Sequence, residues 1–482
     1  MILRHTLGYT LVKFFPAIAS LVTLMLFTRL MTPAQFGEYS LTVNVTTTMV
    51  AILGNFLVIG LGRFEPAAVT VAEKSKLHST VIVTSIALSV AVAVLIGLLK
   101  VFNLLPALSV DYSFLATLFF ITLFMQLSQR LINANLKPKA YGVSLAIRNI
   151  LLLAAGSACL IAGYEVFGVL ASLAVATLLA ALPAIGLWGR ATWRGFDFSE
   201  LKKLWAYGAP LTLLYLFVMI IGFSDRIFID VMLGSDAVGL YSAGYDLTQY
   251  SIAIVASVVH LAAFPIILKA YESEGQVKAK ELMSTALRML LLVMLPVSIG
   301  FIAIKEEVSS VFMGAGFSDV AVMIIPILAL SVLVSSIKSY YFDYAFQITK
   351  TTWLQTIPPM LAALLNCIFN YYLIPAMGVL GAAYATLIAY GFYLLLTVVL
   401  AVKIFQFSRF PWGYLIKLTL ASLLMLFVVK WVEPDVGLLL LLVLKVLVGV
   451  LVFCCLLLAF MKNELILLFK DANAFKGDRD AL

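Results

Sequence analysis

The sequence has few charged residues. Only 12% of its 482 residues are Asp, Glu, Lys or Arg, whereas 63% are hydrophobic. Soluble globular domains are usually about 25% charged and about 45–50% apolar. A larger core cannot hold the excess, because soluble chains of this length divide into domains that each need a polar surface. The composition therefore excludes an ordinary soluble enzyme, a nucleic-acid-binding protein with a polar surface and a disordered protein.

Cysteine and histidine are also scarce, with four and three residues respectively. The cysteines lie inside apolar runs, so we expect them to pack as small hydrophobic side chains. Their spacing fits neither a zinc site nor a disulfide framework. The histidines do not combine with a nucleophile and an acid, and the sequence has no Gly-rich phosphate loop. The sequence therefore predicts a protein that is not an enzyme and that uses no metal or cofactor.

Long apolar runs are what the sequence has in abundance. A membrane-spanning helix needs about 20 apolar residues, and runs of this length predict about 14 spans. The predicted spans are residues 10–30, 39–62, 79–100, 112–132, 141–162, 168–188, 207–232, 238–264, 282–304, 320–346, 354–374, 380–402, 414–432 and 437–461. The longest connection, 189–206, is too short for a folded domain. The predicted fold class is an all-α polytopic membrane protein.

The distribution of basic residues indicates the topology. With the N-terminus placed in the cytoplasm, the cytoplasmic segments hold 22 Lys and Arg and the opposite side holds 4. One missed helix would invert this distribution for everything downstream. We therefore expect both termini in the cytoplasm. The net charge of +8 reflects this topology, and we expect no nucleic-acid partner.

The chain contains an internal repeat. Phe36-Gly37-Glu38-Tyr39-Ser40 resembles Val238-Gly239-Leu240-Tyr241-Ser242 at an offset of 202 residues. Gly168-Val169-Leu170 matches Gly378-Val379-Leu380 at an offset of 210 residues. Each match joins one predicted span to the sixth span after it. The repeat predicts two pseudo-symmetric six-helix lobes related by an axis along the membrane normal, as in transporters built from parallel repeats.

The predicted organisation has four parts. They are a six-helix lobe (1–188), a cytoplasmic linker (189–206), a second six-helix lobe (207–402), and two additional helices with a cytoplasmic tail (403–482). Two such lobes can enclose a central cavity and expose it alternately to each side of the membrane. The sequence has no loop that resembles a channel filter.

Charged residues inside membrane spans are costly, and they usually face a cavity or a partner. The candidates for substrate binding in the cavity are Arg29, Arg63, Arg148, Asp225, Arg226, Arg288, Lys338, Asn366 and Asn370. The candidates for ion coupling are Asp225, Asp246 and Asp343. Arg29 and Arg63 stand near helix ends, where snorkelling to the interface is the favoured alternative. The two amides, four residues apart on one helical face, also suit hydrogen bonds between helices.

The spacing of these charges limits which of them can pair with one another. Asp225 and Arg226 are neighbours that can pair within or between helices. Asp230 follows Asp225 by five residues, and a five-residue separation does not place two side chains on one tight α-helical face. Lys338 and Asp343 have the same separation, so we do not expect a compact pair there.

The positive excess among the intramembrane charges favours an anionic substrate. Arginine suits phosphate because its planar group donates two parallel, charge-assisted hydrogen bonds. A lipid-linked pyrophosphate sugar is such a substrate, since its headgroup is too polar to cross hydrocarbon unaided while its tail stays in lipid. Carrying an anion outward from a negative cytoplasm releases about 2.3 kcal/mol per charge per 100 mV.

Three stretches carry a family resemblance. The first is Leu30-Met31-Thr32-Pro33-Ala34-Gln35-Phe36-Gly37-Glu38-Tyr39-Ser40. The second runs from Tyr207-Gly208-Ala209-Pro210 through Asp225-Arg226-Ile227-Phe228-Ile229 to Gly239-Leu240-Tyr241-Ser242. The third is Asn366, Asn370, Ile374-Pro375 and Gly378-Val379-Leu380-Gly381-Ala382-Ala383. In this order and spacing they resemble the Wzx-type polysaccharide and O-antigen flippases of the multidrug/oligosaccharidyl-lipid/polysaccharide exporter superfamily.

The resemblance implies a V-shaped bundle that moves undecaprenyl-pyrophosphate-linked sugars from the cytoplasmic to the periplasmic leaflet of the bacterial inner membrane. The product would be O-antigen of lipopolysaccharide, capsule or exopolysaccharide. The implied partners are the lipid-linked oligosaccharide, membrane lipids, a polysaccharide polymerase and a chain-length regulator. Many members have twelve helices. Fourteen resembles the lipid II flippase branch, where the added pair forms a groove for the lipid tail.

Three other interpretations remain open. Drug/cation antiport within the same superfamily predicts an acidic cavity, whereas the intramembrane balance here is basic. A membrane polymerase or ligase needs a substantial periplasmic loop, and the longest predicted outside connection is only 305–319. A non-transporting scaffold of a polysaccharide synthase complex would not need the intramembrane charges.

Overall fold

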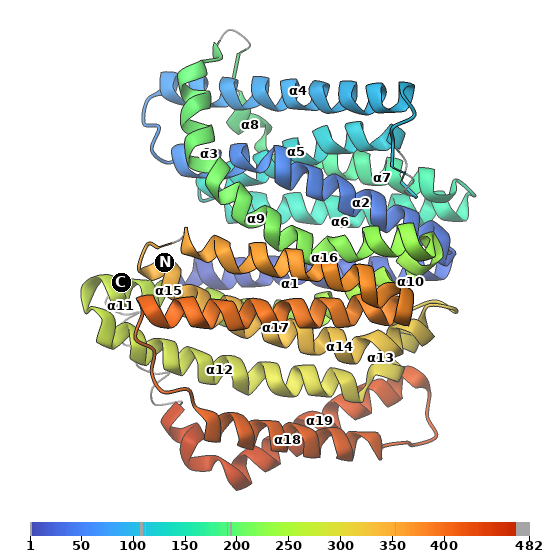
Figure 1. The fold of residues 1–482 in the computed structure, drawn as a ribbon, viewed down its shortest axis with the longest axis vertical. Coiled ribbons are helices and arrows are strands. Elements are labelled where there is room, and N and C mark those ends of the chain that lie inside the picture. Colours follow the sequence, from blue (N-terminus) through green and yellow to red (C-terminus); the bar gives the residue numbers. More distant parts are fainter. Residues whose placement is uncertain are drawn as a thin grey trace. The chain divides into compact units, whose positions relative to one another are not determined.

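The computed structural model describes residues 2–106, 109–110, 112–189, 191–192, 195–351 and 353–468, with the side chains of residues 2–15 and 113 outside the description. Every regular element in these ranges is a helix. The chain forms two compact units, Met1–Ser242 and Ala243–Leu482 (Figure 1). Three residues of the predicted linker (190, 193 and 194) and residues 469–482 of the predicted tail lie outside the described residues.

The first unit contains the helices up to the first half of α10. They are α1 (Ile2–Leu30), α2 (Pro33–Leu53), α3 (Asn55–Phe64), α4 (Val71–Val101), α5 (Tyr112–Ala134), α6 (Pro138–Ile161), α7 (Glu165–Leu179), η1 (Leu182–Ala184), α8 (Ile185–Trp188), α9 (Phe198–Leu233) and α10 (Ser235–Thr248). Helix α9 thus packs with the first unit, whereas the repeat assigns it to the second lobe. The boundary at 207 describes the duplication and stays a prediction.

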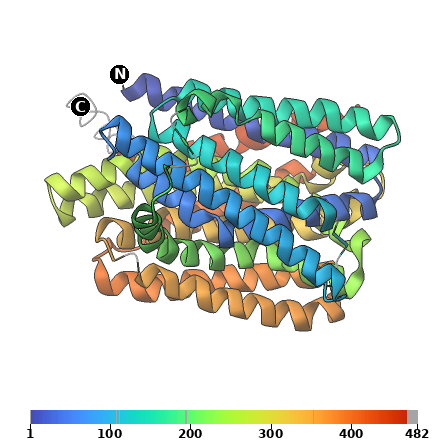
Figure 2. The same cartoon turned by 90° about the horizontal axis from the view of Figure 1, so that it is seen from above.

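The second unit contains the remaining helices. They are η3 (Gln249–Ala253), α11 (Ile254–Ser273), α12 (Gln276–Ala303), α13 (Lys305–Phe312), α14 (Ser318–Ile337), η4 (Lys338–Phe342), α15 (Asp343–Ile348), η5 (Leu354–Thr356), α16 (Ile357–Met377), α17 (Val379–Ile404), α18 (Trp412–Lys430) and α19 (Leu438–Phe460). Helices α16 and α17 pack along their lengths (Figure 2). Helices α18 and α19 lie side by side next to α12 (Figure 1).

The number of spans agrees with the sequence. Among the described residues, 12 helices are long and apolar enough to cross a membrane, and α2 with α3 forms one further span bent by 55°. The bend lies at Gly54, and glycine is a common site of helix kinks. The remaining predicted span coincides with α1, in which the stretch Pro16–Leu30 is an apolar helix. The all-helical membrane fold is confirmed, and each predicted span has a counterpart.

The first repeated motif forms a close crossing between α2 and α10. A Cβ atom on Gly37 would overlap the carbonyl oxygen of Ser235, and a Cβ atom on Gly239 would overlap that of Pro33. These two contacts exchange places under the offset of 202 residues, so the crossing has local two-fold symmetry. Only glycine allows two backbones to approach this closely. The repeat found in the sequence is therefore also a contact in three dimensions.

The second repeated motif is less regular. Gly168 lies inside α7, where its Cβ position is filled by the side chains of Tyr164 and Cys159. Gly378 precedes α17 and has a φ of 62°. Gly381 is the glycine of α17 that packs against its surroundings, with Leu373 backbone at its Cβ position. The residues matched by sequence therefore do not occupy the same place in their helices.

Candidate functional site

Asp225 and Arg226 form the most deeply buried charged cluster of the first unit, with 0% and 1% exposure. The Tyr241 hydroxyl donates to Asp225 Oδ2 at 2.7 Å, and Arg226 Nε donates to Ser242 Oγ at 2.9 Å. Arg226 also donates through Nη1 to the Gly222 carbonyl at 3.2 Å. The two charged neighbours on α9 are therefore held by two neighbouring hydroxyls on α10, and this arrangement fixes the position of both charges.

The same part of α9 holds a third charge, Asp230, which is also buried. Its Oδ2 accepts a hydrogen bond from the Ser109 backbone N–H at 2.7 Å. Its Oδ1 has no hydrogen-bond partner among the described residues. Asp230 thus ties the end of α9 to the segment that precedes α5.

Lys338 and Asp343 form a buried ion pair in the second unit, with Nζ and Oδ2 2.8 Å apart. The expectation that five residues of separation would keep them apart is wrong. Residues Lys338–Phe342 form a π-helical turn, whose wider winding brings residues i and i+5 together. Lys338 Nζ also lies 3.7 Å from the centre of the Tyr393 ring. This predicted cavity cation is therefore neutralised within its own unit.

Asn366 and Asn370 share one face of α16, as the spacing predicted. Both are fully buried, and Asn370 Nδ2 donates to Asn366 Oδ1 at 3.2 Å. The two amides thus support each other along the helix. Their role in substrate binding stays a prediction.

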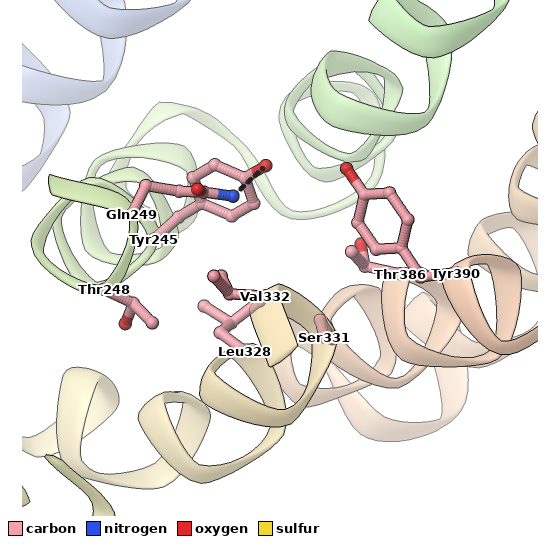
Figure 3. Close-up of a pocket in the computed structure, with 8 residues that line it drawn as sticks. All are labelled: Tyr245, Thr248, Gln249, Leu328, Ser331, Val332, Thr386 and Tyr390. Carbon is pink, nitrogen blue, oxygen red and sulfur yellow. Dashed lines mark hydrogen bonds between the residues drawn. The ribbon is translucent and has the colours of Figure 1, made fainter. Parts of the chain in front are cut away.

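Uncharged polar groups gather in a narrow pocket of the second unit that sequence reasoning missed (Figure 3). Tyr245 and Gln249 face it from α10 and η3, and Gln249 Nε2 donates to the Tyr245 hydroxyl at 3.1 Å. Tyr390 enters from α17. The pocket is too narrow to hold a water molecule. Charge patterns do not reveal it, because amides and hydroxyls do not interrupt an apolar run strongly. The ion-coupling candidate Asp246 lies half-buried next to Tyr245.

The four remaining arginine candidates differ in environment. Arg29 and Arg63 are exposed in the last turns of α1 and α3, as expected of side chains that reach an interface. Arg148 is half-buried in the middle of α6, and its Nε is buried without a hydrogen-bond partner among the described residues. Arg288 lies on α12 in a polar pocket beside the segment that leads to α18. The structure does not bring these four side chains into one described cluster.

The two additional helices carry ion pairs of their own. Lys445 of α19 lies 2.5 Å from Glu307 of α13, and both side chains are buried. Lys417 of α18 lies 2.8 Å from Glu464, which follows α19. Burying a charge in a membrane helix is tolerable when it is paired. Structural contacts therefore account for both lysines of the added pair.

A polar network closes the end of α3. Glu65 accepts from His78 Nε2 at 2.7 Å and from Asn135 Nδ2 at 3.1 Å, and Lys74 Nζ lies at 3.5 Å. Burial raises the pKa of the Glu65 carboxyl, but these hydrogen bonds and the nearby positive charge outweigh burial. The pKa therefore lies below its ordinary value of 4.5. The sequence does not indicate that these residues converge, because Glu65 and Asn135 directly follow α3 and α5 whereas His78 and Lys74 lie in α4.

Metal binding needs several ligands close together. In the described part of the chain, no group of three or more His, Cys, Asp or Glu residues is placed to hold a metal ion. The carboxylates described above can exchange protons, the hydroxyls and amides can donate hydrogen bonds, and the arginines can attract anions.

The fold is shared with transporters of known structure. A lipid II flippase, MurJ, in an inward closed conformation aligns over 95% of this chain and 99% of its own, with a TM-score of 0.79 and 16% identity. An inward-facing multidrug resistance MATE transporter of the MOP superfamily aligns over 81% and 95%, with a TM-score of 0.65 and 14% identity. A MOP superfamily transporter from Pyrococcus furiosus aligns over 84% and 96%, with a TM-score of 0.59 and 15% identity.

These neighbours are transporters and a flippase, and at such low identity they show the fold alone. No curated protein matches the sequence. The family model described as polysaccharide biosynthesis protein matches residues 2–271, which is more than half of the chain. The chain therefore belongs to the polysaccharide biosynthesis protein family and has the fold of the MurJ and MATE transporters.

Proposed function

We propose that the protein is a flippase that moves undecaprenyl-pyrophosphate-linked oligosaccharide from the cytoplasmic to the periplasmic leaflet of the bacterial inner membrane. The product would serve the assembly of O-antigen, capsule or exopolysaccharide. One observation carries the proposal, namely that a polysaccharide biosynthesis family member has the fold of a lipid II flippase over 95% of its length. A lipid-linked saccharide is the substrate class that joins these two findings.

The mechanism follows from the polarity of such a substrate. The pyrophosphate and sugars need a water-lined route, whereas the lipid tail can remain in the bilayer. Two six-helix lobes that rock would open this route to each side in turn. Cations along it would bind the pyrophosphate, and the membrane potential would favour its outward movement by about 2.3 kcal/mol per charge per 100 mV.

Arg148 is the cation of the first unit best suited to this role. It is half-buried in the middle of a membrane helix, and no described residue forms an ion pair with it. A charge at such a position is costly unless an anion or water reaches it. Arg226, in contrast, already donates to Ser242 and Gly222, so we expect it to position Asp225 and α10 as well as to contribute charge.

The decisive experiment is deletion of the gene in its host, followed by identification of the accumulated lipid-linked intermediate. We expect undecaprenyl-pyrophosphate-linked repeat units on the cytoplasmic leaflet and little surface polymer. Complementation by Arg148→Gln should restore much less polymer than complementation by Lys139→Gln, which removes an exposed charge from the same helix. Equal polymer from both variants, at equal membrane levels, would remove Arg148 from the proposal.

Drug/cation antiport is the second candidate, because the MATE transporters share the fold. The two functions separate in the deletion strain. Antiport predicts unchanged lipid-linked intermediates and increased sensitivity to cationic drugs. Flipping predicts accumulated lipid-linked intermediates and unchanged sensitivity to these drugs. The enzyme alternative is disfavoured because the predicted periplasmic connection 305–319 is occupied mainly by the short helix α13, which leaves little room for a catalytic loop.

The proposed orientation has its own test. Reporter fusions at residues 70, 136 and 197 should all report the cytoplasm, because each follows an even number of predicted spans. A periplasmic signal at any of the three positions would contradict the topology, and with it the inward location of both termini.

A further inference from the structure

A polar pocket of about 270 Å³ lies in the second unit between α12 and the segment that precedes α18. This volume far exceeds the about 10–15 Å³ that a single water needs. Its polar lining consists of Lys278, Glu281, Ser284, Thr285, Arg288 and Ser408. Such a polar lining is unusual in a helix that is long and apolar enough to cross a membrane.

The pocket follows one face of α12. Positions 278, 281, 285 and 288 recur at intervals of three or four residues, which places them along one side of the helix. Helix α18 packs against α12, and the Tyr414 hydroxyl of α18 donates to the Arg288 carbonyl oxygen at 3.3 Å. The pocket therefore opens beside one of the two helices that lie outside the predicted duplication.

The charges around the pocket leave a positive excess. Lys278 has a loose partner in Glu281, with Nζ and Oε2 3.7 Å apart. From the facing elements, Lys417 and Glu464 neutralise each other. The Arg288 guanidinium has no ion pair or hydrogen bond among the described residues, and its Nε is buried. A guanidinium that is half-buried and unpaired in a membrane helix calls for an anion.

The position of α12 limits what that anion can be. Its 28 residues span about 42 Å, whereas the hydrocarbon core of a bilayer is about 30 Å thick. The first turns, which carry Lys278 and Glu281, thus project toward the headgroup region. Arg288 lies about 18 Å along the helix from Gln276, within reach of that region through its long side chain.

We propose that this pocket binds a phosphate oxyanion, with the planar group of Arg288 and the hydroxyls of Ser284 and Thr285 as its donors, while the Ser408 hydroxyl donates to the Lys280 carbonyl oxygen at 3.4 Å. Arginine matches phosphate because two parallel N–H groups meet two oxygens, and serine and threonine hydroxyls can complete the shell. The phosphate comes from the headgroup of an anionic membrane lipid or from solution. The site lies on α12 toward α18, and binding there does not depend on the proposed transport substrate.

The test uses the purified full-length chain in detergent after removal of bound lipid. Phosphatidylglycerol is titrated in, and retained lipid is counted by native mass spectrometry. We expect Arg288→Gln to retain the lipid about tenfold more weakly, the loss expected from a charge-assisted pair. Arg409→Gln is the matched control, because Arg409 is an exposed arginine next to Ser408 that does not line the pocket. It should change retention by less than about twofold.

Competition with inorganic phosphate identifies the source. Retention of phosphatidylglycerol without displacement by phosphate supports a lipid headgroup site, and displacement by phosphate supports a site open to solution. Equal retention by the wild type and Arg288→Gln, or an equal loss in Arg288→Gln and Arg409→Gln, would overturn the proposal. If Arg288→Gln does not fold, Ser284→Ala provides the same comparison with a milder change, and unchanged retention in that variant would count against the site.

Discussion

The two copies of the repeated motif, at the starts of α2 and α10, differ in what surrounds their Tyr and Ser side chains. In the first copy, the Tyr39 ring packs edge-on against Phe27 at 5.6 Å, and Ser40 accepts a hydrogen bond from Asn44 Nδ2 at 3.2 Å. In the second copy, Tyr241 donates to Asp225 and Ser242 accepts from Arg226. The second copy thus uses its Tyr and Ser hydroxyls to hold the charged pair Asp225 and Arg226, whereas Phe27 and Asn44 contact the Tyr and Ser of the first copy.

The difference originates in the preceding helices. At the offset of 202, the counterparts of Asp225 and Arg226 are Thr23 and Leu24 of α1. The two copies form one crossing together, and only the α10 side of it holds the charged pair Asp225 and Arg226. At these matched positions the charged pair is therefore present only in the second copy.

The largest expected effect concerns the glycine that the two copies share. Gly37→Ala and Gly239→Ala should each lower the free energy of unfolding by about 3 kcal/mol or more, because the new Cβ would overlap a backbone oxygen that cannot move cheaply. Thermal unfolding in detergent measures both. Gly97→Ala is the control, since nothing lies near its Cβ position and alanine favours a helix. A tolerated alanine at only one of the two glycines would break the symmetry of the crossing.

The next effect concerns the charges of the second copy. Tyr241→Phe should cost about 1.5–3 kcal/mol of unfolding free energy, because it leaves a buried carboxylate without one of its donors. Tyr164→Phe, which changes an exposed tyrosine, should be nearly neutral. The same thermal assay serves both variants. Equal stability of the two variants would show that Asp225 does not depend on this hydroxyl.

A smaller effect concerns how each copy begins its helix. Helix α2 starts with a capping box, in which the Thr32 hydroxyl accepts from the Gln35 N–H and Gln35 Oε1 accepts from the Thr32 N–H. Helix α10 instead follows Gly234 with a φ of 88°. Thr32→Ala should cost about 1 kcal/mol, whereas Thr32→Ser should keep most of the cap. A neutral Thr32→Ala would mean that the crossing alone positions α2.

The last comparison concerns Glu65, a buried carboxylate that directly follows the bent span begun by the first copy. Its effect on stability appears at acidic pH. Its pKa lies below 4.5 in the folded protein, so the stability it contributes is present above 4.5 and is lost as the pH falls through the lower folded value. Wild type should therefore lose more stability than Glu65→Gln when detergent-solubilised protein is taken below pH 4.5. Parallel curves for the two proteins would contradict the Glu65 network.

The sequence predicted the fold far better than the site. Apolar runs fix membrane helices because every span must be both long and apolar, and the repeat was visible as Gly-x-Tyr-Ser in both copies. The Lys338–Asp343 pair could not be anticipated, because ordinary helical periodicity separates residues five apart and nothing local indicated a π-helical turn. The place of Arg288 in the central cavity stays a prediction, and the pocket that it lines could not be anticipated because that pocket includes Ser408, more than a hundred residues later.

Gly37 and Gly239 meet in the way that two identical chains meet across a dimer axis. Each glycine approaches the residue that lies four positions before its counterpart, which is the self-complementary pattern of an isologous interface. One polypeptide thus preserves a contact that a homodimer of half-length chains would form. Separately expressed halves that carry these glycines would therefore present complementary surfaces to each other. In a homodimer of half-length chains, one substitution of this glycine would disturb the contact at two symmetric sites.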